Sequence, residues 1–441
     1  MLRKILCLML CLALLAATAC TRTIPPAADP APATDAPAAT DAPADEPAEV
    51  TPAPEATDAP AADDEAFDAA LVSDLLMQTE EFSVNLLKNL KTAYTEENTL
   101  FSPVALNTAM AALYAAANGD TEEELRVVMS GKTEPEDVID ALAYLYTTLG
   151  GESFAAHNSL HMTSRLAFAP SYLETVAAPL GLETQTHSFG DAAAFTELNA
   201  AAKKASGEQV DDLTEATAAA DTLYVLSGFT LNAAFDQPFD PAASQEGDFE
   251  STTGLSKVSM MHGDFTVGYA EDEYMQMVSL PMNDGALQLK LILPREGGEN
   301  AFDEAMIQYA EGWLSAEAVS DQSVSLTLPQ FTLETKAGYR EVFSTMGLTR
   351  ALRAQTVDFS GMIDPALVLP TPLNDLYSVG SLNIGPNGIN LRSEASTPAA
   401  SASSEESVEL VLDRPFMVAV TDTQTGALLV MGWVNQVGSG R

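Results

Sequence analysis

Apolar residues in the first part of the folding sequence recur at steps of three and four, the spacing of a helix that buries one face. This spacing predicts helices between residues 66 and 150. Ser102 followed by Pro103 is typical of a helix start, and we expect that helix to end at Gly119. After Gly150 the pattern changes to short alternating or continuous apolar runs, which are typical of strands.

The two patterns follow one another along the chain, and they define the fold class. We expect an α+β fold, with the N-terminal helices packed on mixed sheets. Asn283, Asp284 and Gly285 lie between two apolar runs and predict a hairpin. The remaining expected elements are strands within 222–233, 256–270, 274–294, 323–335 and 415–434, and helices near 191–206, 300–315 and 338–347.

One stretch near the C-terminus combines a strand pattern with a loop composition. Its apolar, small or hydroxyl residues alternate with polar ones and then give way to "PAASASSEES", which is typical of an exposed loop. No charge falls on the first of the two faces. That face comprises Ile389, Leu391, Ser393, Ala395 and Thr397, and the polar face comprises Asn390, Arg392, Glu394 and Ser396.

The N-terminus has the features of an export signal and a spacer. Residues 1–20 combine two early basic residues, an apolar run and the sequence "ATAC", which predicts a lipoprotein signal with Cys20 as the lipid-bearing residue. The alternative is an ordinary secretory signal cut near Ala19. Residues 21–65 are rich in Ala, Pro, Thr and Asp, which predicts a disordered tether. We expect residues 66–441 to form a single folded domain.

Charge and cysteine content narrow the possible partners. The formal net charge is −43, which argues against nucleic acid because phosphates attract Lys and Arg. Of the three cysteines, Cys7 and Cys11 leave with the signal, so the mature chain can form no internal disulfide. We expect an extracellular protein attached to a bacterial cell surface by the lipid on Cys20.

Two short motifs suggest chemistry but are incomplete. Residues 130–133, "SGKT", lack the glycine and the preceding strand of a phosphate-binding loop, so we interpret them as a helix terminus. His157 and His161 are four apart, but Asn158 stands where a zinc protease has glutamate, and the surrounding pattern is that of a strand. We therefore expect no catalytic residue, no metal and no cofactor, and we predict that the protein is not an enzyme.

Several separated segments, taken together, resemble the serpin family of loop-insertion protease inhibitors. They occur in the order that the family has, over residues 67–438. The similar segments are "NTLFSPVALNTAMAALYAAANGDTEEEL" at 98–125, "LYVLSGFTLNAAFDQPFD" at 223–240, "LPQFTLET", "MGLTRAL", "DFSGM" and the tail "LVLDRPFMVAVTDTQTGALLVMGWV".

The resemblance implies a serpin fold whose reactive-centre loop precedes "RPF". A protease attacks this loop as a substrate, and the cut loop then enters the central sheet as a further strand and stalls the acyl-enzyme. Gly388 corresponds to the hinge glycine, and Ile389, Leu391, Ser393, Ala395 and Thr397 would face inward on insertion. The spacing back from Pro415 places the reactive bond near Ala402, Ser403 and Ser404.

Some residues depart from the family pattern. Pro386 and Asn387 replace the usual pair of glutamates, and Leu391 and Arg392 lie in a region that is usually alanine, so we expect slower insertion. The buried polar cluster under the sheet is altered as well. It keeps Ser102, has Ala105 and Ser227 where Ser and Asn are usual, and shows no histidine near residue 376.

The function predicted from the resemblance is suicide inhibition of serine proteases, with cysteine proteases also open. The small residues of the loop suggest elastase-like or subtilisin-like targets, and we expect a monomer. The alternatives are a non-inhibitory serpin that acts as a surface binding module or protease substrate, and an unrelated surface lipoprotein.

Overall fold

The computed structural model describes residues 69–149, 152–189, 192–210, 213, 222–295, 307, 312–314, 320–367, 369–390 and 407–438 of the 441-residue chain. Cys20, the segment 21–65 and the loop residues Leu391, Ser393, Ala395, Thr397, Ala402, Ser403 and Ser404 lie outside the described residues. The fold below concerns the unit after Asp63.

The first described part of the chain is helical, as the apolar spacing predicts. Ser102 caps the second helix, where its Oγ accepts a hydrogen bond from the Ala105 N–H at 3.3 Å, and Pro103 occupies the first helical position. This helix ends at Ala116, earlier than expected, and Gly119 instead precedes the next helix at φ +56°. The four helices are α1 (Ala69–Ala93), α2 (Pro103–Ala116), α3 (Asp120–Val128) and α4 (Pro135–Thr148).

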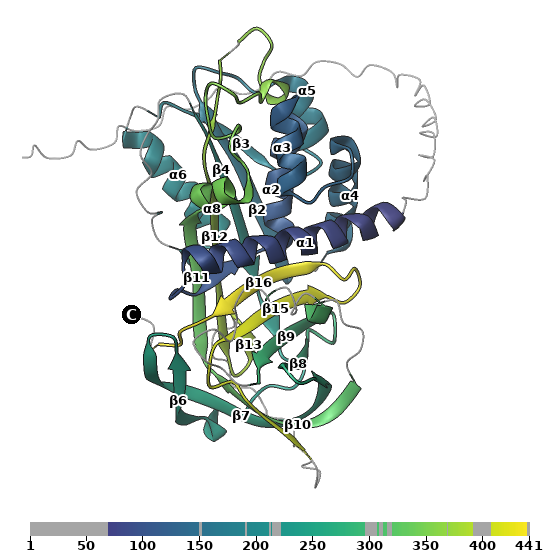
Figure 1. Cartoon of the computed structure of the whole chain (residues 1–441), viewed down its shortest axis with the longest axis vertical. Helices are drawn as coiled ribbons and strands as arrows, with labels where there is room; N and C mark the ends of the chain where they lie inside the picture. Colours follow the sequence, from purple (N-terminus) through teal and green to yellow (C-terminus); the bar gives the residue numbers. More distant parts are fainter. Residues whose placement is uncertain are drawn as a thin grey trace, which may run out of the picture. The chain divides into compact units, whose positions relative to one another are not determined.

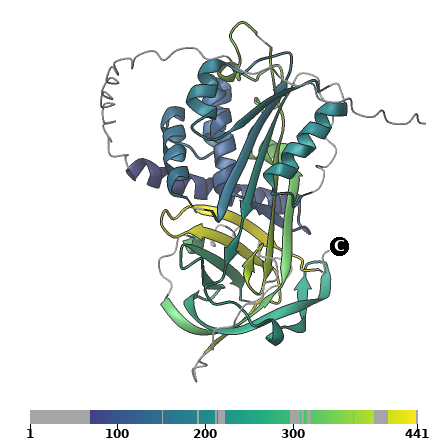
Figure 2. The ribbon, with the colours of Figure 1, turned by 180° about the vertical axis from the view of Figure 1, so that it is seen from behind.

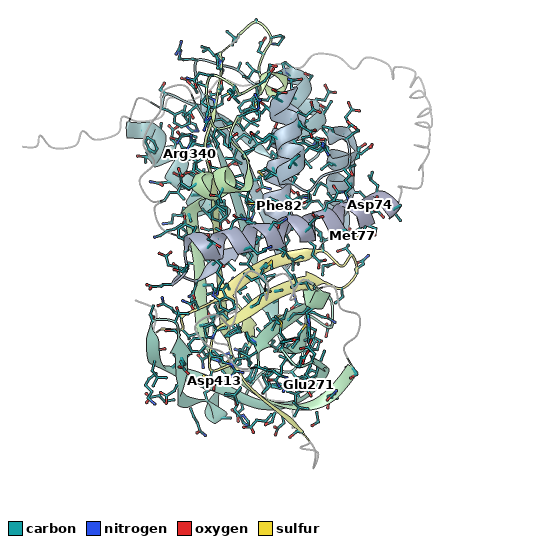
Figure 3. All side chains as sticks on the ribbon, in the orientation of Figure 1. Asp74, Met77, Phe82, Glu271, Arg340 and Asp413 are labelled. Carbon is teal, nitrogen blue, oxygen red and sulfur yellow. The ribbon has the colours of Figure 1, made fainter. Side chains whose placement is uncertain are left out.

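Helix α1 illustrates how the apolar spacing becomes packing. Phe82 is fully buried in the core, whereas Met77, on another side of the same helix, is 60% exposed (Figure 3). Helix α1 lies across the ends of the helices that follow it (Figure 1) and packs on α2, α4 and the C-terminal strand β16 (Leu428–Val434). The first helices therefore form one layer that covers the sheets.

The central sheet joins strands that are distant in the sequence. It has the order β3-β2-β4-β12-β13-β5, and β11 also pairs with β12, on the edge opposite β4 and β13. Strands β4 and β12 are parallel neighbours, although about 140 residues separate them in the chain. The strands are β2 (Phe154–Thr163), β3 (Glu183–His187), β4 (Leu223–Leu231), β5 (Ala233–Ala234), β11 (Phe331–Gly338), β12 (Leu373–Gly385) and β13 (Gly388–Ile389).

The two faces of the central sheet pack against different layers. On β4, Leu223 and Val225 join the core that contains α1 and α2, whereas Tyr224 and Leu226 join a smaller cluster with helix α6 (Ala192–Ala205). Successive strand residues point to opposite faces, so β4 is apolar on both sides and reads as a continuous apolar run. Helix α6 contacts β2, β4 and β12, and so lies across these three strands on this face of the sheet (Figure 2).

A second sheet contains the C-terminal strands. Its order is β1-β16-β15-β9-β8-β7-β10-β14, with β6 paired to β7. These strands are β1 (Thr99–Phe101), β6 (Gln245–Ser251), β7 (Gly254–Glu271), β8 (Met275–Met282), β9 (Leu287–Pro294), β10 (Ser320–Pro329), β14 (Val408–Val411) and β15 (Phe416–Asp422). The short helices are α5 (Pro170–Tyr172), η1 (Leu173–Ala177), η2 (Pro241–Ala243), α8 (Arg340–Met346) and η3 (Ser360–Met362).

The expected hairpin is confirmed between β8 and β9. Asn283, Asp284 and Gly285 all have positive φ, at 54°, 57° and 78°, a conformation that Asn, Asp and Gly tolerate best. The last strand pair is Met282 with Leu287, so the connection has four residues. The α+β class, with helices first and sheets afterwards, is also confirmed, whereas strands β3, β6 and β12 were not predicted. Most of the expected helix near 300–315 lies outside the described residues.

Candidate functional site

The two incomplete motifs have structural surroundings. Helix α3 ends at Val128, and the Gly131 N–H donates to the Arg126 carbonyl at 2.8 Å, so "SGKT" is a helix terminus as interpreted. His157 and His161 lie on strand β2, also as expected. Among the described residues, no group of three or more His, Cys, Asp or Glu side chains could hold a metal ion.

His161 belongs instead to a series of hydrogen bonds that runs from the buried His161 and His187 of the sheet to the exposed Glu197 of helix α6. Its Nε2 is 2.8 Å from the Ser159 Oγ, and its Nδ1 is 2.8 Å from the His187 Nε2. His187 Nδ1 is 2.7 Å from the Glu197 Oε2 on α6. Every nitrogen of both rings has a partner, so the series fastens α6 to strands β2 and β3. The spacing of His157 and His161 did not indicate this pairing.

The burial of His161 leads to a prediction about the stability of the protein at low pH. Burial, and secondarily the nearby His187, lower the pKa of His161 to about 3, against about 6.5 in an unfolded chain. Because the folded state resists protonation, the stabilisation is complete above pH 6.5 and is lost as the pH falls toward 3. Between pH 6.5 and 4.5, protonation of His161 in the unfolded chain should lower the free energy of unfolding of wild type by roughly 2–3 kcal/mol. We expect the His161→Gln variant to lose that much less over the same pH range.

Denaturant unfolding at the two pH values measures this difference. His262→Gln is the control, because His262 is exposed on strand β7. Equal acid sensitivity in wild type and His161→Gln would contradict the prediction.

The polar cluster under the central sheet uses residues that the sequence comparison did not single out. Asn158, on β2, donates through Nδ2 to the Ala105 carbonyl of α2 at 3.0 Å. Thr335 donates through its hydroxyl to the Ser378 carbonyl at 3.3 Å, and the buried Tyr339 hydroxyl donates to the Leu100 carbonyl at 3.3 Å. Asn158, Thr335 and Tyr339 are not among the residues that the resemblance assigned to this cluster, which were Ser102, Ala105 and Ser227.

Strands β4 and β12 pair directly only along part of their length. The parallel register runs from Leu223 opposite Leu373 to Gly228 opposite Val379. Beyond this point the two strands diverge, and we call the point of divergence the fork. Above the fork the gap is filled by β13, whose two residues pair with β12 on one side and with β5 on the other, antiparallel to both.

The segment Gly388–Asn390, here called the hinge, is held in this gap by its turn and by its glycine. The carbonyls of Pro386 and Asn387 accept the N–H groups of Phe239 and Phe235, each at 2.9 Å. Gly388 has φ +140°, and a Cβ at this position would lie 2.0 Å from the Ala233 carbonyl oxygen. Only glycine fits this close approach of two backbones.

The hinge differs in one respect from the expectation that the whole inward face enters the sheet after cleavage. Ile389 is already fully buried in the chain before any cut, packed in the core with Leu382 and Ile384. Its burial therefore adds nothing to the stability gained on cleavage, and an Ile389→Arg substitution would damage the uncut form itself. The physical reason is the turn at Pro386 and Asn387, which returns the chain into the sheet.

Gly388→Ala tests the hinge geometry. We expect the uncut protein to lose roughly 2–4 kcal/mol, because the Cβ would collide with backbone that cannot move alone. Gly385→Ala is the matched control, since a Cβ there meets nothing within 4 Å and its φ is not positive. Thermal unfolding of the two variants measures this difference, and equal midpoints for Gly388→Ala and Gly385→Ala would contradict the hinge geometry.

The far end of the predicted loop returns to the second sheet. The described chain resumes at Ser407 and enters β14, which pairs in parallel with β10. Arg414 then donates to the carbonyls of Pro294 and Arg295, and Phe416 is fully buried. Residues 391–406 thus connect two different sheets, with one end at the fork.

The register of β13 can be extended down the fork. Continuing its pairing with β12 and with β5 places residue 395 opposite Ser378 on one side and Ser227 on the other. Ser378 and Ser227 already face each other in the parallel pair. A strand can therefore enter between β4 and β12 without any slip of one against the other, if the two move apart by one strand spacing of about 4.8 Å.

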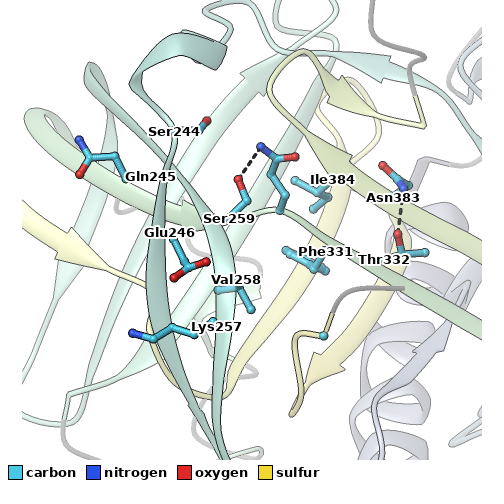
Figure 4. Close-up of a pocket in the computed structure, with 12 residues that line it drawn as sticks. Ser244, Gln245, Glu246, Lys257, Val258, Ser259, Phe331, Thr332, Asn383 and Ile384 are labelled. Carbon is cyan, nitrogen blue, oxygen red and sulfur yellow. Dashed lines mark hydrogen bonds between the residues drawn. The ribbon is translucent and has the colours of Figure 1, made fainter. Parts of the chain in front are cut away.

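A polar cavity of about 540 Å³ lies beside the hinge, between strands β6, β7, β11 and β12 (Figure 4). Asn383 lines it and donates through Nδ2 to the Thr332 hydroxyl at 2.8 Å. The backbone of Asn383 contacts the hinge, so this wall is shared between the cavity and the fork.

No helix of the described residues is long and apolar enough to cross a membrane.

Two parallel central strands that diverge around an anchored hinge are the arrangement of a loop-insertion fold. A family model described as "Serpin (serine protease inhibitor)" matches residues 77–437, and the chain belongs to this family. It is 25% identical over 368 residues to an uncharacterized serpin-like protein of Thermococcus kodakarensis, covering 80% of this chain and 83% of that protein. It is 22% identical to plasminogen activator inhibitor 1 of Sus scrofa, covering 80% and 90%.

The solved structures agree in fold. Tengpin, a thermophilic serpin in the native state, matches with a TM-score of 0.75 and 20% identity, covering 83% of this chain and 94% of that one. Serpin48 from the insect Tenebrio molitor matches with a TM-score of 0.72 and 19% identity, covering 83% and 99%. The predicted family and serpin fold are confirmed.

Proposed function

We propose that the protein inhibits serine proteases by trapping them as its cleaved loop enters the central sheet. The observation that carries the proposal is the extended register, in which both neighbours of the new strand are already aligned. Leu391 would lie between Leu382 and Leu231, and Ala395 between Ser378 and Ser227. Each pair is small or apolar and buried, which suits the side chains that the sequence offers.

The expected targets follow from the loop sequence. Residues 398–404, "PAASASS", contain only proline and small side chains around the candidate bond at Ala402, Ser403 and Ser404. Elastase-like and subtilisin-like proteases accept small apolar residues. Trypsin-like proteases require Arg or Lys, and the nearest basic residue, Arg392, lies too close to the hinge.

A second function is favoured by the residues that follow the hinge. Bulky Leu391 and charged Arg392 stand where efficient inhibitors of the family usually have alanine, and slow insertion allows the protease to complete hydrolysis. In this alternative the protein is a non-inhibitory serpin, either a surface binding module or a protease substrate.

Incubation with a panel of serine proteases, followed by denaturing gels and mass spectrometry, separates the two functions. An inhibitor forms a covalent complex that survives the detergent, and the cut maps within 399–406. A clipped chain without a complex indicates a substrate. Cuts in the 21–65 segment are recorded separately, because spacers of this composition are readily clipped. A first cut in the folded part outside 399–406 would overturn the bait assignment.

The location is a separate proposal. Cys20 would carry the lipid, and the 21–65 segment would hold the inhibitor away from the surface of a bacterial cell. Cys20→Ala should release the protein or leave its signal uncut. Intact mass of the native protein decides it, and an unmodified N-terminus would count against anchoring.

A further inference from the structure

We propose that Asn390 is a positioning residue for loop insertion, a latch whose side chain closes the fork and must withdraw before the strand can advance. The inference rests on the proposed function, because the latch has an effect on inhibition only if the loop inserts. Nothing in the alternating pattern of the sequence points to it. That pattern assigns Asn390 to the polar face of the inserted strand.

Both donor positions and the oxygen of the Asn390 side-chain amide form hydrogen bonds at the fork. Nδ2 donates to the Leu231 carbonyl of β4 at 2.8 Å and to the Ser381 carbonyl of β12 at 3.0 Å. Oδ1 accepts from the Asn383 N–H at 2.9 Å. One side chain thus joins the two strands that must separate, and it satisfies carbonyls that would otherwise lack partners in the gap.

The backbone of Asn390 ends the inserted segment. Its N–H donates to the Asn383 carbonyl at 2.8 Å, which continues the register of β13 by one residue. Its φ is +53°, however, a left-handed conformation that no strand residue adopts. Asn tolerates this conformation better than most residues, because its short amide can bond to nearby backbone. The strand therefore stops at Ile389 for a local reason.

Further insertion requires Asn390 to change in two ways. Its φ must move to the extended region, and its amide must leave Leu231, Ser381 and Asn383. In the extended register residue 390 lies opposite Asn383 and Asn232, both of which are exposed, so its side chain then faces solvent. The side-chain hydrogen bonds stabilise the uncut form and are absent both from the inserted form and from the path that leads to it.

The test compares the full-length protein with variants at two neighbouring asparagines. Asn390→Gly keeps the positive φ and removes the side chain. Asn390→Asp keeps the size but replaces both donors by a carboxylate that faces two carbonyl oxygens. Asn383→Ala is the matched control, because it removes only the bond to Thr332 and leaves its backbone bonds to Asn390 in place.

Each protein is cut in the loop with a protease that completes hydrolysis and dissociates. The rate at which the cut protein reaches its final thermal midpoint is then measured. We expect Asn390→Gly and Asn390→Asp to convert roughly tenfold faster than wild type, with Asn383→Ala unchanged. We also expect lower midpoints only for their uncut forms. Equal rates in Asn390→Gly and Asn383→Ala, or an equal loss of stability before and after cleavage, would overturn the latch.

A second readout keeps failure of the latch distinct from failure of the proposed function. If wild type gains no stability on cleavage, insertion is absent and the inhibitor proposal fails. In that case, hydrogen exchange of the backbone N–H of Asn383, which donates to the Asn390 Oδ1, tests the latch contact in the uncut protein by itself. We expect roughly tenfold faster exchange in Asn390→Gly than in wild type, and unchanged exchange would overturn the latch.

Discussion

Cleavage within residues 399–406 is expected to raise the thermal midpoint of unfolding by about 5 °C, the reverse of the usual effect of cutting a chain. Residues 390–397 would form hydrogen bonds with β4 and β12 at once and bury Leu391 and Ala395 in the core. After the ordering of these residues is counted, a net gain of roughly 3–5 kcal/mol remains. Ile389 is buried beforehand and contributes nothing further.

Differential scanning calorimetry of the intact and cut protein measures this change. The cut position is confirmed by mass spectrometry, and a sample clipped only in the 21–65 segment is the control. Because the intact form persists kinetically, the scan rate is varied as well. A midpoint that stays level or falls would show that the loop does not insert.

Leu391→Arg is expected to abolish that rise and to convert a trap into a substrate. The extended register places residue 391 between Leu382 and Leu231, which are both fully buried. An unpaired guanidinium there costs several kcal/mol, more than the burial of leucine contributes. The protease would therefore still cut the loop, but the stalled complex would not accumulate.

Arg392→Ala is the matched control for this variant, since residue 392 falls on the opposite face of the inserted strand. Calorimetry before and after cleavage, together with the yield of detergent-stable complex, measures both consequences. A Leu391→Arg protein that gains stability and traps protease as wild type does would place residue 391 outside the sheet and refute the register.

The residues of the hinge act before cleavage, whereas the residues that follow it act during insertion. Gly388 and Ile389 belong to the sheet before cleavage, and Asn390 holds the boundary. The departures from the family pattern at Pro386 and Asn387 lie in the turn whose carbonyls accept from Phe235 and Phe239. These residues therefore stabilise the starting position of the loop.

Local sequence was sufficient wherever an element depends on its own residues. The cap at Ser102, the turn at Asn283 and Asp284, and the apolar face of α1 follow from spacing, capping and backbone preference. The succession of N-terminal helices and later sheets followed from the same patterns, although strands β3, β6 and β12 were not predicted. The family followed from motifs spread over the chain.

Tertiary structure alone decided which distant strands became neighbours. Nothing near Ser227 or Ser378 indicates that they face each other, because strand pairing depends on packing over the whole chain. The relay from His161 through His187 to Glu197, and the amide of Asn390 across the fork, arise in the same way. A side chain's own neighbours in sequence predict its face of a strand, but its hydrogen-bond partners come from strands and helices that only the fold brings together.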